Sequence, residues 1–225
     1  MLPEGRGGAD MAIRIFPLGL RGGPVVVTLA AALLLLSASF ALAAAAGSVV
    51  GVLGGCFVES GGSRSPAKIG QQVQVGDTVD VATDGKLKLR MADGSVISVA
   101  AGTRMTIAAY GVDAAGQRQD AHLSLGQGLL RAVVAPVERP ARFEVDTAVG
   151  TAAVRSTDWF VEASGGSMQV GVLSGSVDMT GAATKRAVTI PARWGGRLEG
   201  GRDPVPPRVW SQSEFDAVIA RTNVP

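Results

Sequence analysis

Lys86 to Val99 read KLKLRMADGSVISV, and this stretch decides the fold class of the chain. Apolar and basic side chains alternate over residues 86–91, which is the period-two pattern of a strand with one buried face. The pair Asp93-Gly94 then interrupts the pattern, and such pairs favour tight turns because glycine adopts a positive φ at little cost. A second apolar run follows at once. The stretch therefore predicts two short strands joined by a turn.

The same alternation recurs between residues 47 and 200, for example in residues 122–125, 143–146 and 188–190. Glycine-containing turn signals separate these runs, and no segment keeps apolar residues at helical spacing for three turns. Many short strands with glycine turns are typical of layered β folds. We therefore predict an all-β domain over residues 47–200, either a twisted β-sandwich or a right-handed β-solenoid.

Residues 201–225 differ from this pattern. Prolines between residues 203 and 208 predict a stiff connector rather than a strand. After them, Ser211 or Ser213 can cap a short helix, and Glu214 and Asp216 in its first turn suit the helix dipole. The sequence thus predicts a Pro-rich connector and a short C-terminal helix.

The N-terminal segment has the features of an export signal. Residues 25–46 contain no charged side chain, basic residues precede them, and Ala41-Leu42-Ala43 provides the small residues that a signal peptidase needs. We expect residues 1–43 to be a signal peptide, with Met11 as an alternative start. The alternative is an uncleaved inner-membrane anchor at residues 25–46, which is long enough to span a bilayer. In both cases the domain is periplasmic or secreted.

Composition excludes one class of partner. The chain has a net charge of +2, and removal of residues 1–43 brings the charge near zero. Its Lys and Arg residues do not gather into a basic run, so we expect no nucleic-acid partner. Membrane contact is expected only through the N-terminal segment, if that segment stays uncleaved.

The chain has one cysteine, Cys56, and one histidine, His122. One cysteine allows no intramolecular disulfide. Its setting, Leu53-Gly54-Gly55-Cys56, loosely resembles a lipobox, and the alternative is a buried strand cysteine. His122 alternates with Leu123 and Leu125, which places it on the polar face of a strand. These residues do not form a metal-ligand or Ser-His-Asp set, so the sequence predicts no cofactor, no metal and no enzymatic activity.

A set of ordered motifs points to a known family. They are VGDTV at 75–79, DG at 84–85, MADGSVISV at 91–99, TRMTI at 103–107, LGQGLL at 125–130, FEVDT at 143–147 and VRSTDWFV at 154–161. In this order they resemble the FecR domain family over residues 47–200, and the run ending in Val-Arg-Ser-Thr-Asp is the most specific. The family usually has glycine where this chain has Ser156.

The resemblance implies a periplasmic or extracellular β-rich domain that takes part in signalling. In iron-uptake regulators of the family, this domain lies between a cytoplasmic anti-sigma segment and a C-terminal domain that contacts an outer-membrane receptor. Residues 1–24 and 201–225 are too short for either part. We therefore expect the binding module without direct control of a sigma factor.

The motif residues are candidate site residues, for which we predict mainly structural roles: Gly76, Asp77, Asp93, Gly94, Arg155, Thr157 and Asp158. Arg155 and Asp158 would form a charged site if a turn at Ser156 brought them together. Trp194, next to Gly195-Gly196, is the most promising ligand surface among the tryptophans.

Taken together, the sequence predicts a non-enzymatic binding or sensing module of the cell envelope. Its partner would be an envelope protein or a glycan such as peptidoglycan. The alternative is a structural or assembly component that pairs with other β proteins through its strand edges.

Overall fold

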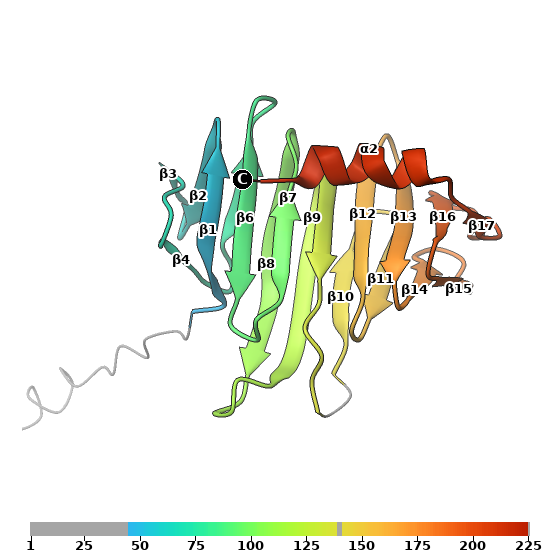
Figure 1. Ribbon diagram of the computed structural model, residues 1–225, viewed down its shortest axis with the longest axis horizontal. Coiled ribbons are helices and arrows are strands. Elements are labelled where there is room, and N and C mark those ends of the chain that lie inside the picture. The colour runs from blue at the N-terminus through green and yellow to red at the C-terminus, as the bar shows by residue number, and fades with distance from the viewer. Residues whose placement is uncertain (1–44, 139–140, 225) are drawn as a thin grey trace, which may run out of the picture. The chain divides into compact units, whose positions relative to one another are not determined.

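The strands of this chain form two sheets that face each other (Figure 1). The computed structural model describes residues 45–138 and 141–224. The predicted signal peptide or anchor therefore lies outside the described residues, apart from the last two positions of the alternative anchor. Residues 43–225 make a separate compact unit.

The first sheet holds, in spatial order, β4 (Gln72–Val73), β1 (Gly47–Leu53), β6 (Lys86–Met91), β7 (Val96–Val99), β9 (Arg118–Val133), β12 (Asp158–Ser164), β13 (Ser167–Ser174), β16 (Trp194–Glu199) and β17 (Arg208–Val209). The second sheet holds β3 (Ser63–Pro66), β2 (Cys56–Ser60), β5 (Thr78–Val81), β8 (Thr103–Val112), β9, β10 (Phe143–Asp146), β11 (Gly150–Val154), β14 (Ser176–Gly181) and β15 (Ala187–Pro191).

One strand, β9, belongs to both sheets. Its N-terminal part pairs with β8 and β10, and its C-terminal part pairs with β7 and β12. The change of sheet occurs near Gly128, which has a φ of 95°. A Cβ at this position would collide with Thr103, so only glycine lets the two backbones approach so closely.

The pairing pattern decides between the two predicted architectures. A right-handed β-solenoid stacks parallel strands, whereas here every pairing between described strands is antiparallel except that of β9 with β10. The all-β prediction is confirmed, and the fold is the twisted sandwich. The strands at residues 86–91 and 96–99 form the predicted pair around Asp93-Gly94.

The core lies between the sheets and follows the alternation read from the sequence. In β6, Leu87 and Leu89 are fully buried while the basic residues between them are not. In β10, Phe143 and Val145 are likewise fully buried, and the acidic residues that follow each of them are not. Truncation of such a buried leucine to alanine costs about 2–5 kcal/mol, so these positions hold the fold together.

The predicted C-terminal helix is α2 (Gln212–Thr222), and it begins with Ser211 as N-cap. Ser211 and Glu214 form a reciprocal capping box. Hydrogen bonds from Arg208 and from the Ser211 amide, the first being the stronger cause, lower the pKa of Glu214 to about 2. No helix within the described part of the chain is long and apolar enough to cross a membrane.

Helix α2 lies across the outer face of the first sheet (Figure 1). Phe215 is fully buried against Phe160 of β12 and Trp210, with ring centroids 6.3 and 5.5 Å away. The connector before the helix stays on the sandwich, because Val205 N donates to Arg197 O at 2.9 Å. It also contains β17, a short strand that the proline pattern did not predict, and β17 pairs with β16.

Candidate functional site

A buried ion pair lies beneath the candidate site. Arg118 at the start of β9 pairs with Asp93 in the β6–β7 turn, and both side chains are inaccessible to solvent. Burial of two charges is costly unless their hydrogen-bonding capacity is met by neighbours. Asp93 meets this condition, because its carboxylate also accepts from Ser95 N at 2.9 Å and from the Tyr110 hydroxyl at 2.6 Å.

Tyr110 shows the electrostatic effect of this cluster. Burial, followed by the hydrogen bond to Asp93, raises the pKa of the phenol far above its usual value of 10. Tyr110 therefore stays neutral and continues to donate to Asp93 throughout the physiological pH range.

The cluster fixes the backbone of the Val-Arg-Ser-Thr-Asp motif. Arg118 Nη2 donates to the carbonyl of Arg155 at 2.8 Å, and Ser95 Oγ accepts from Ala135 N at 2.9 Å. On the other side of the motif, Asp158 accepts two hydrogen bonds from Arg131, at 2.8 and 2.7 Å. The turn between β11 and β12 is therefore held from both ends.

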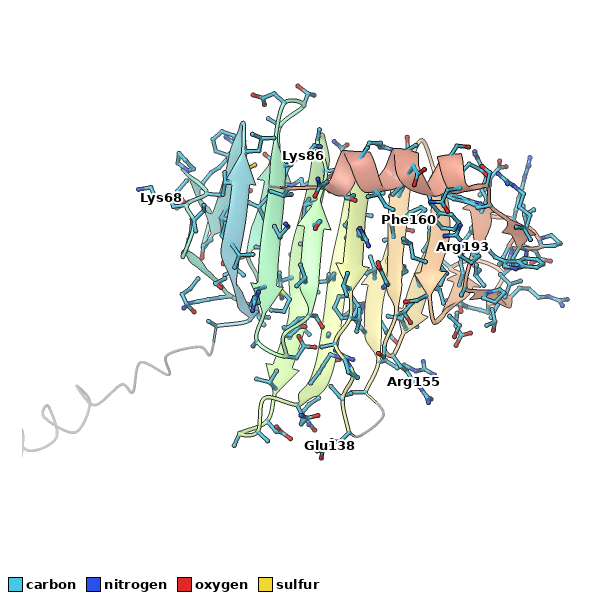
Figure 2. The ribbon with its side chains drawn as sticks, in the orientation of Figure 1. Lys68, Lys86, Glu138, Arg155, Phe160 and Arg193 are labelled. Carbon is cyan, nitrogen blue, oxygen red and sulfur yellow. The ribbon has the colours of Figure 1, made fainter. Side chains whose placement is uncertain are left out.

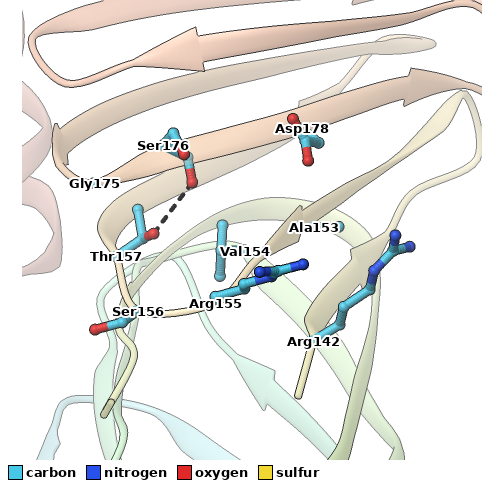
Figure 3. Close-up of a pocket in the computed structure, with 9 residues that line it drawn as sticks. All are labelled: Arg142, Ala153, Val154, Arg155, Ser156, Thr157, Gly175, Ser176 and Asp178. Atoms are coloured by element: carbon cyan, nitrogen blue, oxygen red, sulfur yellow. Dashed lines mark hydrogen bonds between the residues drawn. The ribbon is translucent and has the colours of Figure 1, made fainter. Parts of the chain in front are cut away.

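A pocket of about 300 Å³ opens on this turn (Figure 3). It is bounded by the end of β11, the turn into β12, the β13–β14 turn and the residue before β10. Figure 2 shows Arg155 projecting from the end of the strands away from α2. The lining residues are Arg142, Ala153, Val154, Arg155, Ser156, Thr157, Gly175, Ser176 and Asp178.

The floor of the pocket is rigid. Thr157 is buried, and its hydroxyl donates to the carbonyl of Ser176 at 3.1 Å, which ties the β11–β12 turn to the β13–β14 turn. Gly175 has a φ of 86°, and a Cβ there would lie 2.7 Å from the Thr157 hydroxyl. The backbone of the β11–β12 turn, which carries Arg155, is therefore held in place at the pocket.

The charged groups at the mouth are Arg142, Arg155 and Asp178. Arg155 is exposed and its guanidinium forms no hydrogen bond or ion pair with the described residues. Arg142 has one long contact to Glu144 at 3.5 Å. Asp178 accepts from the Thr189 hydroxyl at 2.7 Å. The mouth thus presents two cationic groups and one carboxylate.

The structure does not bring Arg155 and Asp158 together, since Asp158 pairs with Arg131 instead. The hydrogen bond to Asp158 is the largest cause and raises the pKa of the Arg131 guanidinium, against the smaller opposing effect of partial burial. The turn motif at Gly76-Asp77 lies elsewhere, where Asp77 accepts from Gln74 N at 2.8 Å and Gly76 has a φ of 94°.

The three tryptophans differ in exposure. Trp159 is fully buried, Trp210 packs against α2, and Trp194 is half-buried and packs against the main core. Trp194 does not line the Arg142–Arg155 pocket. The residue predicted as a ligand surface and the pocket are therefore separate features.

His122, the one histidine of the chain, lies apart from the pocket. His122 Nε2 is 2.5 Å from Asp146 Oδ2, and Asp146 Oδ1 accepts from the Thr151 hydroxyl at 2.5 Å. In this trio the hydroxyl contacts the carboxylate rather than the imidazole, so the histidine does not activate it. Within residues 45–138 and 141–224, His, Cys, Asp and Glu side chains form no metal-binding group of three or more.

Cys56 begins β2 and is buried, which corresponds to the second of the two predicted settings. Its thiol contacts the carbonyls of Leu53 and Lys86, each at 3.3 Å. Burial, the largest cause, raises the pKa of the thiol, so the thiolate is disfavoured.

Sequence reasoning missed Arg118, Arg131 and Arg142. The first two have partners that are distant along the chain, and no spacing rule connects Arg118 to Asp93 or Arg131 to Asp158. Arg142 precedes a strand and looks like an ordinary exposed residue. The one available signal was the motif at 154–158.

Comparison with known proteins agrees with the fold. Residues 77–178, which include every pocket residue, match the family described as FecR protein, so the predicted resemblance is confirmed for this region. No curated protein matches the sequence. Two crystal structures of a proposed anti-sigma factor from Parabacteroides distasonis, at 1.65 and 2.50 Å resolution, share the fold with a TM-score of 0.52 and 16% identity.

The similarity to these two structures covers 62% of this chain, and 63% and 62% of theirs. The matched region is therefore less than two thirds of each solved chain. At this level of identity the likeness concerns the fold.

Proposed function

We propose, from the FecR family match of residues 77–178, that this chain is a non-enzymatic binding and sensing module of the cell envelope. One observation carries the proposal. Residues 154–157 of the motif that resembles the family most specifically line the pocket, and Arg118 and Arg131 hold the motif through Arg155 and Asp158. A preorganised pocket on a rigid scaffold is the usual arrangement of a binding site.

The chemistry of the pocket favours binding over catalysis. Its polar groups are guanidinium, hydroxyl and one carboxylate, and the described residues that line it include no histidine or lysine that would act as a base. The only histidine of the chain is engaged with Asp146. A site of this kind holds a ligand without activating it.

Location and partner form part of the proposal. The uncharged segment at residues 25–46 and the Ala41-Leu42-Ala43 site support export to the periplasm or beyond. A partner in the envelope, either a protein or a glycan, fits this location. The similar structures are described as a proposed anti-sigma factor, which favours a protein partner within a signalling system.

Assembly through strand edges has less support. The outer strands of the second sheet are β3 and β15, which are short and end in Pro66 and Pro191. Short edge strands with proline are a common protection against edge-to-edge pairing. The edges of this sheet are therefore poorly suited to recruit another β protein.

The test is capture of an envelope component by residues 43–225, with the affinity tag placed before residue 43 because Val224 is buried. We expect the folded protein, monomeric by size exclusion, to retain a specific envelope protein or to co-sediment with purified peptidoglycan. Heat-unfolded protein is the control. Self-association without retention of either component would contradict the proposal, and so would hydrolysis of peptidoglycan.

A further inference from the structure

The pocket at the β11–β12 turn contains one guanidinium group, that of Arg155, with no partner among the described residues and another, that of Arg142, with a single long contact. Most described arginines form ion pairs within the chain, as Arg64, Arg104, Arg118, Arg131, Arg208 and Arg221 do. Among the described residues Arg155 has no such partner, and Arg142 has only its contact with Glu144 at 3.5 Å. Both line the same pocket (Figure 3).

Hydrogen bonds within the protein hold the backbone of Arg155 in place. Its carbonyl accepts from the buried Arg118, and the next residues are anchored by Thr157 and Asp158. Arg155 therefore leaves a fixed backbone with its guanidinium free. A free guanidinium on a fixed base loses less entropy on binding than one on a mobile loop.

Charge decides what the pocket selects. The lining contains two guanidinium groups and one carboxylate, that of Asp178, which is the only acid among the lining residues. Asp178 is also engaged with Thr189 at 2.7 Å. An anionic group is therefore favoured over a cationic one, and the planar fork of arginine suits carboxylate or phosphate oxygens.

We propose that Arg142 and Arg155 form a binding site for an oxyanion group, a carboxylate or a phosphate, carried by the envelope ligand of this module. This inference rests on the proposed binding function and names the chemistry that its pocket recognises. Ser156 and Ser176 belong to the same lining and add neutral hydroxyl donors to it. A volume of about 300 Å³ accommodates one such group with a small substituent.

The experiment measures binding of defined probes to residues 43–225 by titration of backbone amide resonances. The probes are succinate, inorganic phosphate and the neutral succinamide. We expect saturable shifts at Ser156, Gly175 and Ser176 with at least one of the two anions, and none with succinamide. The stronger of the two anions identifies the source as a carboxylate or a phosphate. Binding is expected to weaken as salt is added.

Two variants and a matched control test the assignment. Arg142→Ala and Arg155→Ala are each expected to weaken anion binding about tenfold or more, since each removes charge-assisted hydrogen bonds. Arg90→Ala removes the same charge from an exposed position of β6 that does not line the pocket, and binding should be unchanged. Thermal unfolding of each variant shows that the fold is intact.

Two results would overturn the proposal: no saturable shift with either anion at tens of millimolar, or equal weakening by Arg155→Ala and Arg90→Ala. Neither result would show whether the module binds an envelope partner. If the module retains its envelope partner while Arg155→Ala has no effect on retention, the binding function stands and the oxyanion site is wrong. If no partner is retained but anion binding is lost in Arg155→Ala, the oxyanion site stands and the proposed binding function is wrong.

Discussion

Arg118 and Arg155 lie one hydrogen bond apart, yet the chain uses them in opposite ways. Arg118 is buried, paired with Asp93 and stacked 5.8 Å from the Phe143 ring. Arg155 offers only its carbonyl to that cluster and leaves its side chain exposed at the pocket. The comparison shows that one buried cation holds the scaffold, which leaves the neighbouring cation free for a ligand. Substitution of Arg118 should therefore lower stability, whereas substitution of Arg155 should weaken binding and leave stability nearly unchanged.

Loss of the buried pair should give the largest effect. Arg118→Ala leaves Asp93 charged and buried without its partner, so we expect the free energy of unfolding to fall by about 3–5 kcal/mol. Arg155→Ala removes an exposed side chain and should change it by no more than about 0.5 kcal/mol. Urea denaturation followed by tryptophan fluorescence measures both values.

The control for that prediction is the double variant Asp93→Asn/Arg118→Met, which should recover part of the loss because no uncompensated charge remains. Equal destabilisation by Arg118→Ala and Arg155→Ala would remove the distinction between the two arginines.

A smaller loss is expected from Tyr110→Phe. This change deletes the hydroxyl that donates to Asp93 at 2.6 Å but keeps the ring, which packs edge-on against Phe143. Removal of one hydrogen bond to a buried carboxylate should cost about 1–3 kcal/mol. The measurement is again urea denaturation, and anion binding at Arg155 should stay close to that of the wild type. A loss as large as that of Arg118→Ala would show that the hydroxyl, not the guanidinium, dominates the cluster.

Tyr110 also predicts a pH dependence. Its pKa is raised in the folded state, so the stability that its neutral form contributes is fully present below about pH 10, the value in the unfolded chain. That contribution is progressively lost as the pH rises above 10 towards the folded-state pKa. Because the chain has a single tyrosine, absorbance at the tyrosinate band reports this group alone.

We expect tyrosinate to appear only as the protein unfolds, and circular dichroism follows the unfolding in parallel. Ionisation near pH 10 with the fold intact would show that the Asp93 cluster is open to solvent.

The smallest effect concerns the carboxylate at the pocket mouth. Asp178→Asn removes the one acid among the lining residues, and the amide oxygen can still accept from Thr189. Exposed charge interactions are weak, so anion affinity should rise by only about twofold to fivefold. Titration with succinate measures the change, and unaltered or reduced affinity would show that Asp178 does not face the bound anion.

The sequence was sufficient for the strands but not for the charged clusters. Alternation at residues 86–91 and the glycine turn at 93–94 are local signals, and the structure contains the strands they predict. The capped helix at Ser211 was also local and is present. Local patterns could not choose the sandwich over the solenoid, because that choice depends on which distant strands pair.

The pocket shows the same limit. The motif at residues 154–158 was recognisable, but its apparent partners Arg155 and Asp158 do not pair. Asp158 reaches Arg131 across the pairing of β12 with β9, and Arg142 joins the pocket only because β10 lies beside β11. These neighbours are set by strand order, which no spacing in the sequence encodes.

The separate roles of Arg118 and Arg155 are tested most directly by comparing Arg155→Ala with wild type in two measurements on the same samples: urea denaturation and titration with succinate and phosphate. We expect an unfolding free energy within about 0.5 kcal/mol of the wild type together with a loss of anion affinity of about tenfold or more. Unchanged affinity, or a loss of affinity explained by loss of the fold, would contradict this expectation.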